Sequence, residues 1–175
     1  MDGHAALLAG LTDELGRLLG ASPELAQELD ELDPDQAVEM GRRAAGAALA
    51  PLAWALAVGD RRDVRWATEF LGVSRQALYK RLRTGSALGV PGRGTTWFPA
   101  WQFDLELRII RSVVGDLVRV FRQADPDVDP QVIAAWANKT NRLLDGATPA
   151  EWVAGGRDDA KVVAAARRAA RGLAA

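Results

Sequence analysis

The sequence predicts a mainly α-helical protein with one small β-hairpin. We expect three parts: a helical module at residues 1–60, a basic module at residues 61–103 and a helical segment at residues 104–175. Apolar residues recur at helical spacing through most of the chain. Several capping residues directly precede a proline, which marks helix starts. The turn-rich stretch ALGVPGRGTTW indicates the hairpin.

Charge is distributed very unevenly along the chain, although the net charge is only −1. Residues 1–60 carry eleven acids and three bases (−8), and residues 61–103 carry eight bases and two acids (+6). Residues 104–175 are nearly balanced, with eleven bases and ten acids. A basic centre beside an acidic part is typical of nucleic-acid-binding proteins. The sequence has no cysteine, which excludes disulfides and cysteine-based zinc sites.

The first module is predicted to form three helices. Leucines at helical spacing indicate the first one: Leu7, Leu8, Leu11, Leu15, Leu18 and Leu19. Ser22-Pro23 and Asp33-Pro34 start the next two. The apolar run Ala44–Val58 is shorter than the roughly 20 residues of a membrane span and contains Pro51, so we expect a buried helix. The first residues lack the pattern of an export signal, and we expect a cytoplasmic protein.

The basic module begins with two short helices. Asp63 is expected to cap the first, VRWATEFL, which Gly72 ends. Ser74 is expected to cap the second, which ends near Gly85. The two strands of the hairpin follow, with PGRG as the turn between them.

The second of these helices has two unlike sides. At 100° per residue, Ala77, Leu78 and Leu82 face one way. The other side carries polar and cationic residues: Arg75, Gln76, Tyr79, Lys80 and Arg83. Arg81 does not fit this division, and we expect it to pair with Asp63 or Glu69.

Two short helices joined by a glycine-containing turn describe a helix-turn-helix, whose second helix enters the major groove of DNA. In that groove arginine reads guanine and glutamine reads adenine. The hairpin is expected to form a wing whose tip, Arg93, contacts phosphate or the minor groove. The predicted DNA-binding residues are Ser74, Arg75, Gln76, Tyr79, Lys80, Arg83 and Arg93. The alternative is a solvated surface helix of a small bundle.

The last segment is predicted to be helical throughout. A long helix is expected at residues 104–123, with Ile110, Val113, Val114, Leu117 and Phe121 on one stripe. Further helices start at Asp129, at the capping box of Thr148 and Glu151, and at Asp158. We expect a homodimer whose surface comes either from the acidic helices or from the stripe of the 104–123 helix.

Two segments are similar to known families. LGVSRQALYKRL, the hairpin and WFPAWQFD resemble the MerR/excisionase-like winged helix-turn-helix. VIAAWANKTNRLLDGATPAEWVAGGRDDAKVVAAARRAA resembles the Xre/MbcA/ParS toxin-binding domain. The matching positions of the second are Trp136, Leu144, Gly146, Thr148, Pro149, Glu151, Trp152 and Gly156. Together the resemblances extend over residues 63 to 172. This sequence departs from the second family in two ways. It has an acidic helical module before the helix-turn-helix, and it has a wing where that family has an Xre-like helical DNA-binding module.

The resemblance implies an antitoxin of a type II toxin–antitoxin system. Such a protein binds operator DNA to repress its own synthesis and neutralises a toxin of the RES class, which acts on NAD. The partner-binding residues would be Trp136, Thr148, Trp152 and Arg168. Either tryptophan could instead be a core residue, and Arg168 could simply interact with the dipole of the last helix. The alternatives are a stand-alone transcription or nucleoid factor without a toxin partner, and a scaffold that does not bind DNA.

The sequence does not indicate an enzyme, a metal site or a cofactor. The single histidine, His4, lies close to the first residue, and Ser74 has no nearby histidine base. DPDVDP begins like a calcium loop but has Pro130 and Trp136 where glycine and a bidentate glutamate are required. GVPGRG lacks the spacing of a dinucleotide-binding loop.

Overall fold

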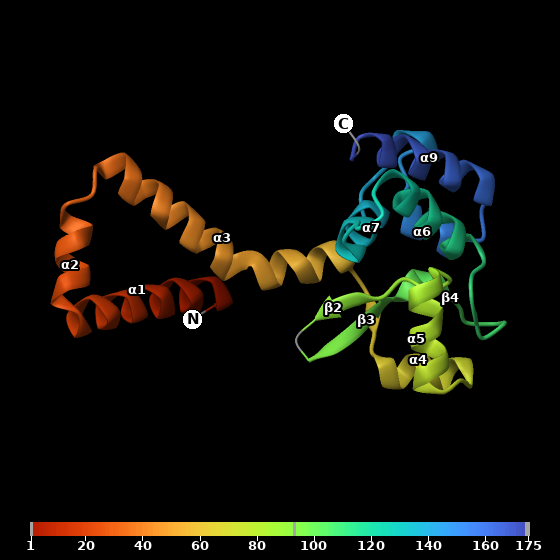
Figure 1. Cartoon of the computed structure of the whole chain (residues 1–175), viewed down its shortest axis with the longest axis horizontal. Helices are drawn as coiled ribbons and strands as arrows, with labels where there is room; N and C mark the ends of the chain where they lie inside the picture. Colours follow the sequence, from red (N-terminus) through yellow and green to blue (C-terminus); the bar gives the residue numbers. More distant parts are fainter. Residues whose placement is uncertain (1, 93, 174–175) are drawn as a thin grey trace. The chain divides into compact units, whose positions relative to one another are not determined.

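The computed structural model describes residues 2–92 and 94–173, which fold mainly into helices with two small antiparallel sheets (Figure 1). Arg93, the predicted tip of the wing, lies outside the described residues. The chain divides into two compact units, residues 1–50 and residues 51–175. This division falls ten residues before the predicted module boundary at residue 60, and Val58 is fully buried in the core of the second unit.

The first unit contains helices α1 (Gly3–Ala21) and α2 (Pro23–Asp30) and the beginning of α3 (Pro34–Val58). Asp2 and Ser22 cap α1 and α2 through hydrogen bonds that their side chains accept from backbone N–H groups. The prediction of a buried helix at Ala44–Val58 is half wrong. The run is helical, but Val58 is its only buried residue; Trp54 packs partly buried against the larger core, and most of the other side chains are exposed.

The second unit begins with the last turns of α3 and continues into β1 (Arg61–Arg62), α4 (Val64–Leu71) and α5 (Arg75–Thr84). Strands β2 (Val90–Gly92) and β3 (Thr95–Pro99) form the predicted hairpin, with Val90 opposite Trp97. The strand order is β1-β3-β2, and β1 adds to the hairpin with Arg62 opposite Phe98. Arg61 and Arg62, the first residues of the predicted basic module, thus belong to the sheet.

The predicted long helix at residues 104–123 is wrong in its first half. Residues 100–112 instead form the 3-10 turn η1 (Ala100–Gln102) and strands β4 (Phe103–Asp104) and β5 (Ile109–Ile110), and helix α6 (Val113–Ala124) follows. The Asp104 carboxylate accepts hydrogen bonds from the N–H groups of Glu106 and Leu107, which closes a turn. Arg108 adopts a φ of 55°, which a helix does not allow.

The remaining elements are α7 (Pro130–Ala137), η2 (Arg142–Leu144), α8 (Pro149–Ala154) and α9 (Asp159–Arg171). The caps predicted at Asp129, Thr148 and Asp158 are all present, and Thr148 and Glu151 form a complete capping box. Helix α6 packs against α9, with α7 beside them (Figure 1).

The apolar stripe of α6 is the centre of the larger hydrophobic core. Val113, Val114, Leu117 and Phe121 are buried there against residues of α7, α8 and α9. This stripe is therefore not a free surface, and the prediction that it supplies a dimer interface is wrong. The acidic helices of the first unit remain as the candidate surface.

Gln102 holds three segments of the second unit together from inside. Within residues 2–92 and 94–173 it is the one buried polar or charged residue. Its side-chain oxygen accepts a hydrogen bond from the N–H of Leu88, and its amide nitrogen donates to the carbonyls of Leu88 and Pro99. The side chain thereby joins η1 to both ends of the hairpin, the segment just before β2 and the last residue of β3.

Of the helices in the described part of the chain, none combines the length and the apolar character that crossing a membrane requires.

Candidate nucleic-acid interface

Helix α5 is fixed to the second unit through its apolar side, as predicted. Leu78 is fully buried in the smaller core cluster, together with Val64, Ala67, Phe98 and Phe103. The turn before α5 allows this packing: Gly72 ends α4 with a φ of 63°, and the Ser74 side chain accepts a hydrogen bond from the N–H of Ala77. Caps and turn together set the direction in which α5 leaves α4.

The opposite side of α5 is a row of exposed polar side chains. Four residues of this row are exposed: Arg75, Gln76, Lys80 and Arg83. Their side-chain nitrogen and oxygen atoms form no ion pair and no hydrogen bond with another described residue. Other cations nearby are already paired, since Arg65 binds Glu69 at 2.9 Å and Arg62 binds Asp60 at 2.8 Å. The hydrogen bond that Arg65 donates to the Glu69 carboxylate raises the pKa of Arg65. The exposed row therefore combines three unpaired cations with an amide.

The other predicted DNA-binding residues differ in accessibility. Ser74 is exposed at the first turn of α5. Tyr79 is half-buried and packs against the smaller core cluster, so only part of it is accessible to a ligand. Arg81 does not make the predicted ion pair with Asp63 or Glu69. Glu69 binds Arg65, and the Asp63 carboxylate accepts a hydrogen bond from the N–H of Trp66 at the start of α4.

A contact that the sequence did not indicate holds the far end of α5. Arg122, on α6, donates hydrogen bonds to the carbonyls of Leu82 and Arg83, both at 3.3 Å. Gly85 ends the helix with a φ of 76°, and a Cβ there would lie 3.0 Å from Arg122 Nη1. The carboxyl end of α5 is thereby joined to the larger core, which limits movement of the row of cations.

The hairpin is fixed at its base by stacked aromatic and cationic groups. The Arg61 guanidinium lies 5.1 Å from the Trp54 ring and 5.2 Å from the Trp97 ring. Gly92 lies directly against Trp97, since a Cβ at this position would be 2.5 Å from that ring. Tryptophans 54 and 97 are 43 positions apart in the sequence, so spacing alone did not predict this stack.

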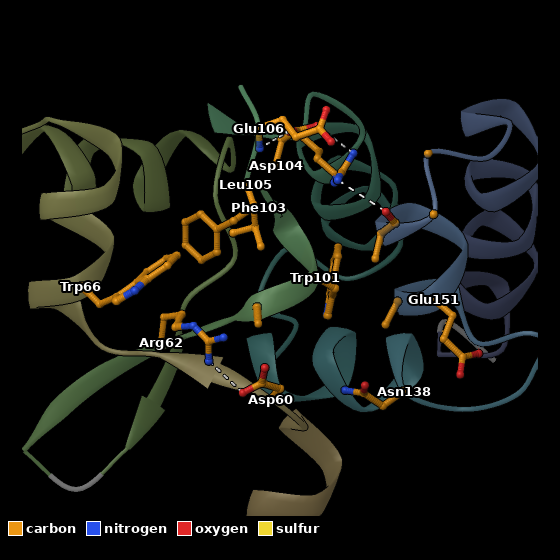
Figure 2. Close-up of a pocket in the computed structure, with 16 residues that line it drawn as sticks. Asp60, Arg62, Trp66, Trp101, Phe103, Asp104, Leu105, Glu106, Asn138 and Glu151 are labelled. Atoms are coloured by element: carbon orange, nitrogen blue, oxygen red, sulfur yellow. Dashed lines mark hydrogen bonds and ion pairs between the residues drawn. The ribbon is translucent and has the colours of Figure 1, made fainter. Parts of the chain in front are cut away.

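A cleft of about 660 Å³ lies elsewhere in the second unit (Figure 2). Its walls come from β1, α4, residues 100–106, α7 and α8. The rings of Trp66 and Phe103 meet edge to face, with centroids 5.1 Å apart. Trp101 Nε1 and Arg111 Nε have no hydrogen-bond partner among the described residues, and neither atom is accessible from the cleft surface.

Several charged groups of the cleft form interactions that stabilise the local structure. Arg111 pairs with Asp104 at 3.0 Å. Hydrogen bonds from the N–H of Leu107, and the Arg111 charge, lower the pKa of Asp104. The hydrogen bond from the N–H of Thr148 lowers the pKa of Glu151. Both carboxyls are therefore ionised at neutral pH and act as hydrogen-bond acceptors for the backbone, which is a structural role.

These lowered pKa values predict acid sensitivity. A carboxyl whose folded-state pKa is lowered stabilises the protein above its ordinary pKa, and this stability is lost as the pH falls through the folded-state value. We expect the free energy of unfolding to fall below about pH 4. Asp104→Asn should lower stability at pH 7 and show a smaller further loss at pH 3 than the wild type. Urea unfolding at the two pH values measures this.

The matched control is Asp127→Asn, because the Asp127 carboxylate is exposed and takes part in no ion pair or hydrogen bond with the described residues. It should show the same loss on acidification as the wild type. An Asp104→Asn variant with an unchanged acid profile would contradict the role assigned to this carboxyl.

The four predicted partner-binding residues lie in the C-terminal helices but differ in exposure. Arg168 is exposed on α9 and Thr148 is half-buried at the start of α8. Trp136 is half-buried, and its ring meets Phe121 edge to face at 5.2 Å. Trp152 is only 5% exposed and its indole N–H donates to the carbonyl of Asp158, so this tryptophan is a core residue and is not available to a partner.

We compared the chain with protein-family models, with curated proteins and with solved structures, and none of the three comparisons finds a match.

Proposed function

We propose that this protein is a DNA-binding repressor of the antitoxin type, in which residues 61–103 act as a winged helix-turn-helix. The observation that carries the proposal is the row formed by Arg75, Gln76, Lys80 and Arg83, four exposed side chains on a helix whose other side is buried. A surface that presents three unpaired cations and an amide on a fixed helix suits the phosphates and base edges of a duplex.

In this proposal α5 enters the major groove. Lys80 and the arginines neutralise phosphates or bind guanine, and Gln76 is placed to read adenine. The amino end of α5, where Ser74 is exposed, offers backbone N–H groups to a phosphate. The hairpin acts as the wing, and the contact of Arg93 with phosphate or the minor groove stays a prediction from the sequence. The stack of Arg61 between Trp54 and Trp97 supports the wing from its base.

The C-terminal helices supply the proposed toxin-binding part. The support is the resemblance of residues 132–170 to the toxin-binding domain, including the capping box of Thr148 and Glu151. Arg168 and the accessible part of Trp136 would contact the toxin, a RES-class protein, and Trp152 would support that surface from the core. Operator binding by the same chain would then repress its own synthesis.

A stand-alone DNA-binding factor is the second candidate. The burial of Trp152 favours it, because this residue was expected to mark the partner surface and is instead used within the chain. Co-expression separates the two candidates. An antitoxin should form a stable complex with the RES-class protein encoded next to it and abolish that protein's toxicity. Unchanged toxicity would leave the DNA-binding factor as the function.

An electrophoretic mobility assay at low salt tests the DNA-binding part. The probes are a duplex from the region upstream of the coding sequence and a random duplex of equal length. Arg75→Ala/Lys80→Ala should weaken binding of the upstream duplex by about tenfold or more, since each good contact contributes about 1–3 kcal/mol. Lys139→Ala/Arg142→Ala removes the same charge from exposed positions in another part of the unit and should bind like the wild type. A wild-type protein that binds neither duplex would overturn the proposal.

A further inference from the structure

The first unit leaves its large apolar side chains uncovered. None of its described residues, 2–50, is buried. Eight of its large apolar side chains are between 37% and 57% exposed: Leu8, Leu11, Leu15, Leu18, Leu25, Val38, Met40 and Leu49. The second unit differs in having two clusters of buried apolar side chains. The second unit thus buries apolar side chains in a core of its own, whereas the described part of the first unit does not.

Four of these residues form a continuous seam along α1. Leu8, Leu11, Leu15 and Leu18 follow each other at spacings of three, four and three, and on a helical wheel they lie within about 80°. This is the a/d pattern by which one helix packs against another in a coiled coil. Leu7 and Leu19, beside the seam, are half-buried, and α1 packs against α2. The contact with α2 leaves the seam itself open.

The first unit exposes a substantial apolar surface. At about half exposure each, the eight side chains present on the order of 600 Å² across α1, α2 and the beginning of α3, of which the four seam leucines supply about half; a standard interface buries ~800 Å² per partner, so the seam would form its apolar centre. Helices of this length depend on packing of their apolar face, because propensity alone leaves them marginal in water. Covering the apolar face of α1 would therefore stabilise the first unit.

Charge restricts what this partner can be. Residues 1–50 carry ten acids and three bases, a net charge of −7, which repels nucleic acid and anionic lipid surfaces. The charge beside the seam is already neutralised, because Arg17 donates hydrogen bonds to Glu14 and lowers its pKa. A seam of identical leucines with paired charges at its side is self-complementary, which is the condition for a two-fold symmetric contact.

We propose that the seam of α1, Leu8, Leu11, Leu15 and Leu18, is covered by the same seam of a second copy of this chain. The contact makes the protein a homodimer through its first unit. The inference goes beyond DNA binding and does not depend on it. If the proposed function also holds, the dimer supplies two copies of α5 for the two halves of a symmetric operator.

Sedimentation velocity of the full chain without DNA tests the dimer. The wild type should sediment at twice the mass of one chain at tens of micromolar. Leu11→Glu/Leu15→Glu places two charges in the seam and should sediment as a monomer with reduced far-ultraviolet helicity. Ala6→Glu/Ala9→Glu adds the same charges to exposed positions on the other side of α1 and should remain a dimer.

Tryptophan reports on whether the variants are otherwise intact. All six tryptophans lie in residues 51–175, so their fluorescence and near-ultraviolet signals follow the second unit alone. These signals should be unchanged in both variants. A monomeric wild type, an assembly larger than a dimer, or a seam variant that remains dimeric with native tryptophan signals would overturn the proposal. None of these outcomes depends on whether the protein binds DNA.

Discussion

Replacing Gln102 by alanine should lower the free energy of unfolding of the second unit by about 3–5 kcal/mol. The side chain is fully buried and makes hydrogen bonds of 3.0, 2.8 and 3.1 Å with the Leu88 N–H, the Leu88 carbonyl and the Pro99 carbonyl. Without it these backbone groups lose their partner and a cavity is left beside them. Both effects act in the same direction, so this substitution should be the most destabilising single change considered.

Urea unfolding followed by tryptophan fluorescence measures the loss, since every tryptophan lies in the second unit. Gln123→Ala is the control, because this glutamine is exposed on α6. The free energy of unfolding of this variant should stay within about 0.5 kcal/mol of that of the wild type. Gln102→Glu keeps an acceptor for Leu88 but loses both donated hydrogen bonds and buries a carboxyl, so it should also be strongly destabilised. A loss below about 1 kcal/mol for Gln102→Ala would contradict the role assigned here.

Removing all three cations of the α5 row should weaken DNA binding by about 100-fold or more at low salt. The variant is Arg75→Ala/Lys80→Ala/Arg83→Ala. Each lost phosphate contact should also reduce the slope of log affinity against log salt by about 0.9, so the slope falls by up to about 3. The combined loss of affinity and of salt dependence distinguishes contacts with phosphate from a change in folding.

Fluorescence anisotropy with a labelled upstream duplex, measured at several salt concentrations, gives both quantities. The control Lys139→Ala/Arg142→Ala/Arg167→Ala removes three exposed cations from other elements, and it should keep the affinity and slope of the wild type. If the control loses as much as the α5 variant, binding depends on net charge alone and α5 is not the interface. An unchanged melting temperature in both variants excludes unfolding as the cause.

The elements of the basic module and the start of α8 could be predicted from the sequence because capping and turn residues act locally. The hydrogen bonds that start α4, α5 and α8 join residues three positions apart, at Asp63, Ser74 and Thr148. The turn residues of the hairpin act over an equally short range. Helical periodicity then placed Leu78 inward and Arg75, Gln76, Lys80 and Arg83 outward, and the burial of these residues agrees.

The errors concern segments whose conformation depends on distant groups. The helix prediction extended the stripe that begins at Ile110 back over residues 104–109, where Leu105, Leu107 and Ile109 alternate with charged residues at strand spacing. In addition, Arg108 donates hydrogen bonds to the carbonyls of Glu69 and Phe70, 39 and 38 positions away. Those contacts and the Asp104 turn favour a strand pair over a helix. The apolar run at Ala44–Val58 predicted a buried helix, but only Val58 is buried, because burial needs a covering surface that no local pattern supplies.

The sequence by itself thus determined most of the helix starts, the start of α6 excepted, together with the hairpin and the polar side of α5, because caps, turns and helical periodicity act within one or two turns of backbone. Only the tertiary structure decided that Trp152 is core, that Gln102 joins the hairpin to η1 and that Arg122 holds the end of α5. Packing and buried hydrogen bonds of this kind join residues that are far apart in the chain, and their partners become defined only when the chain has folded.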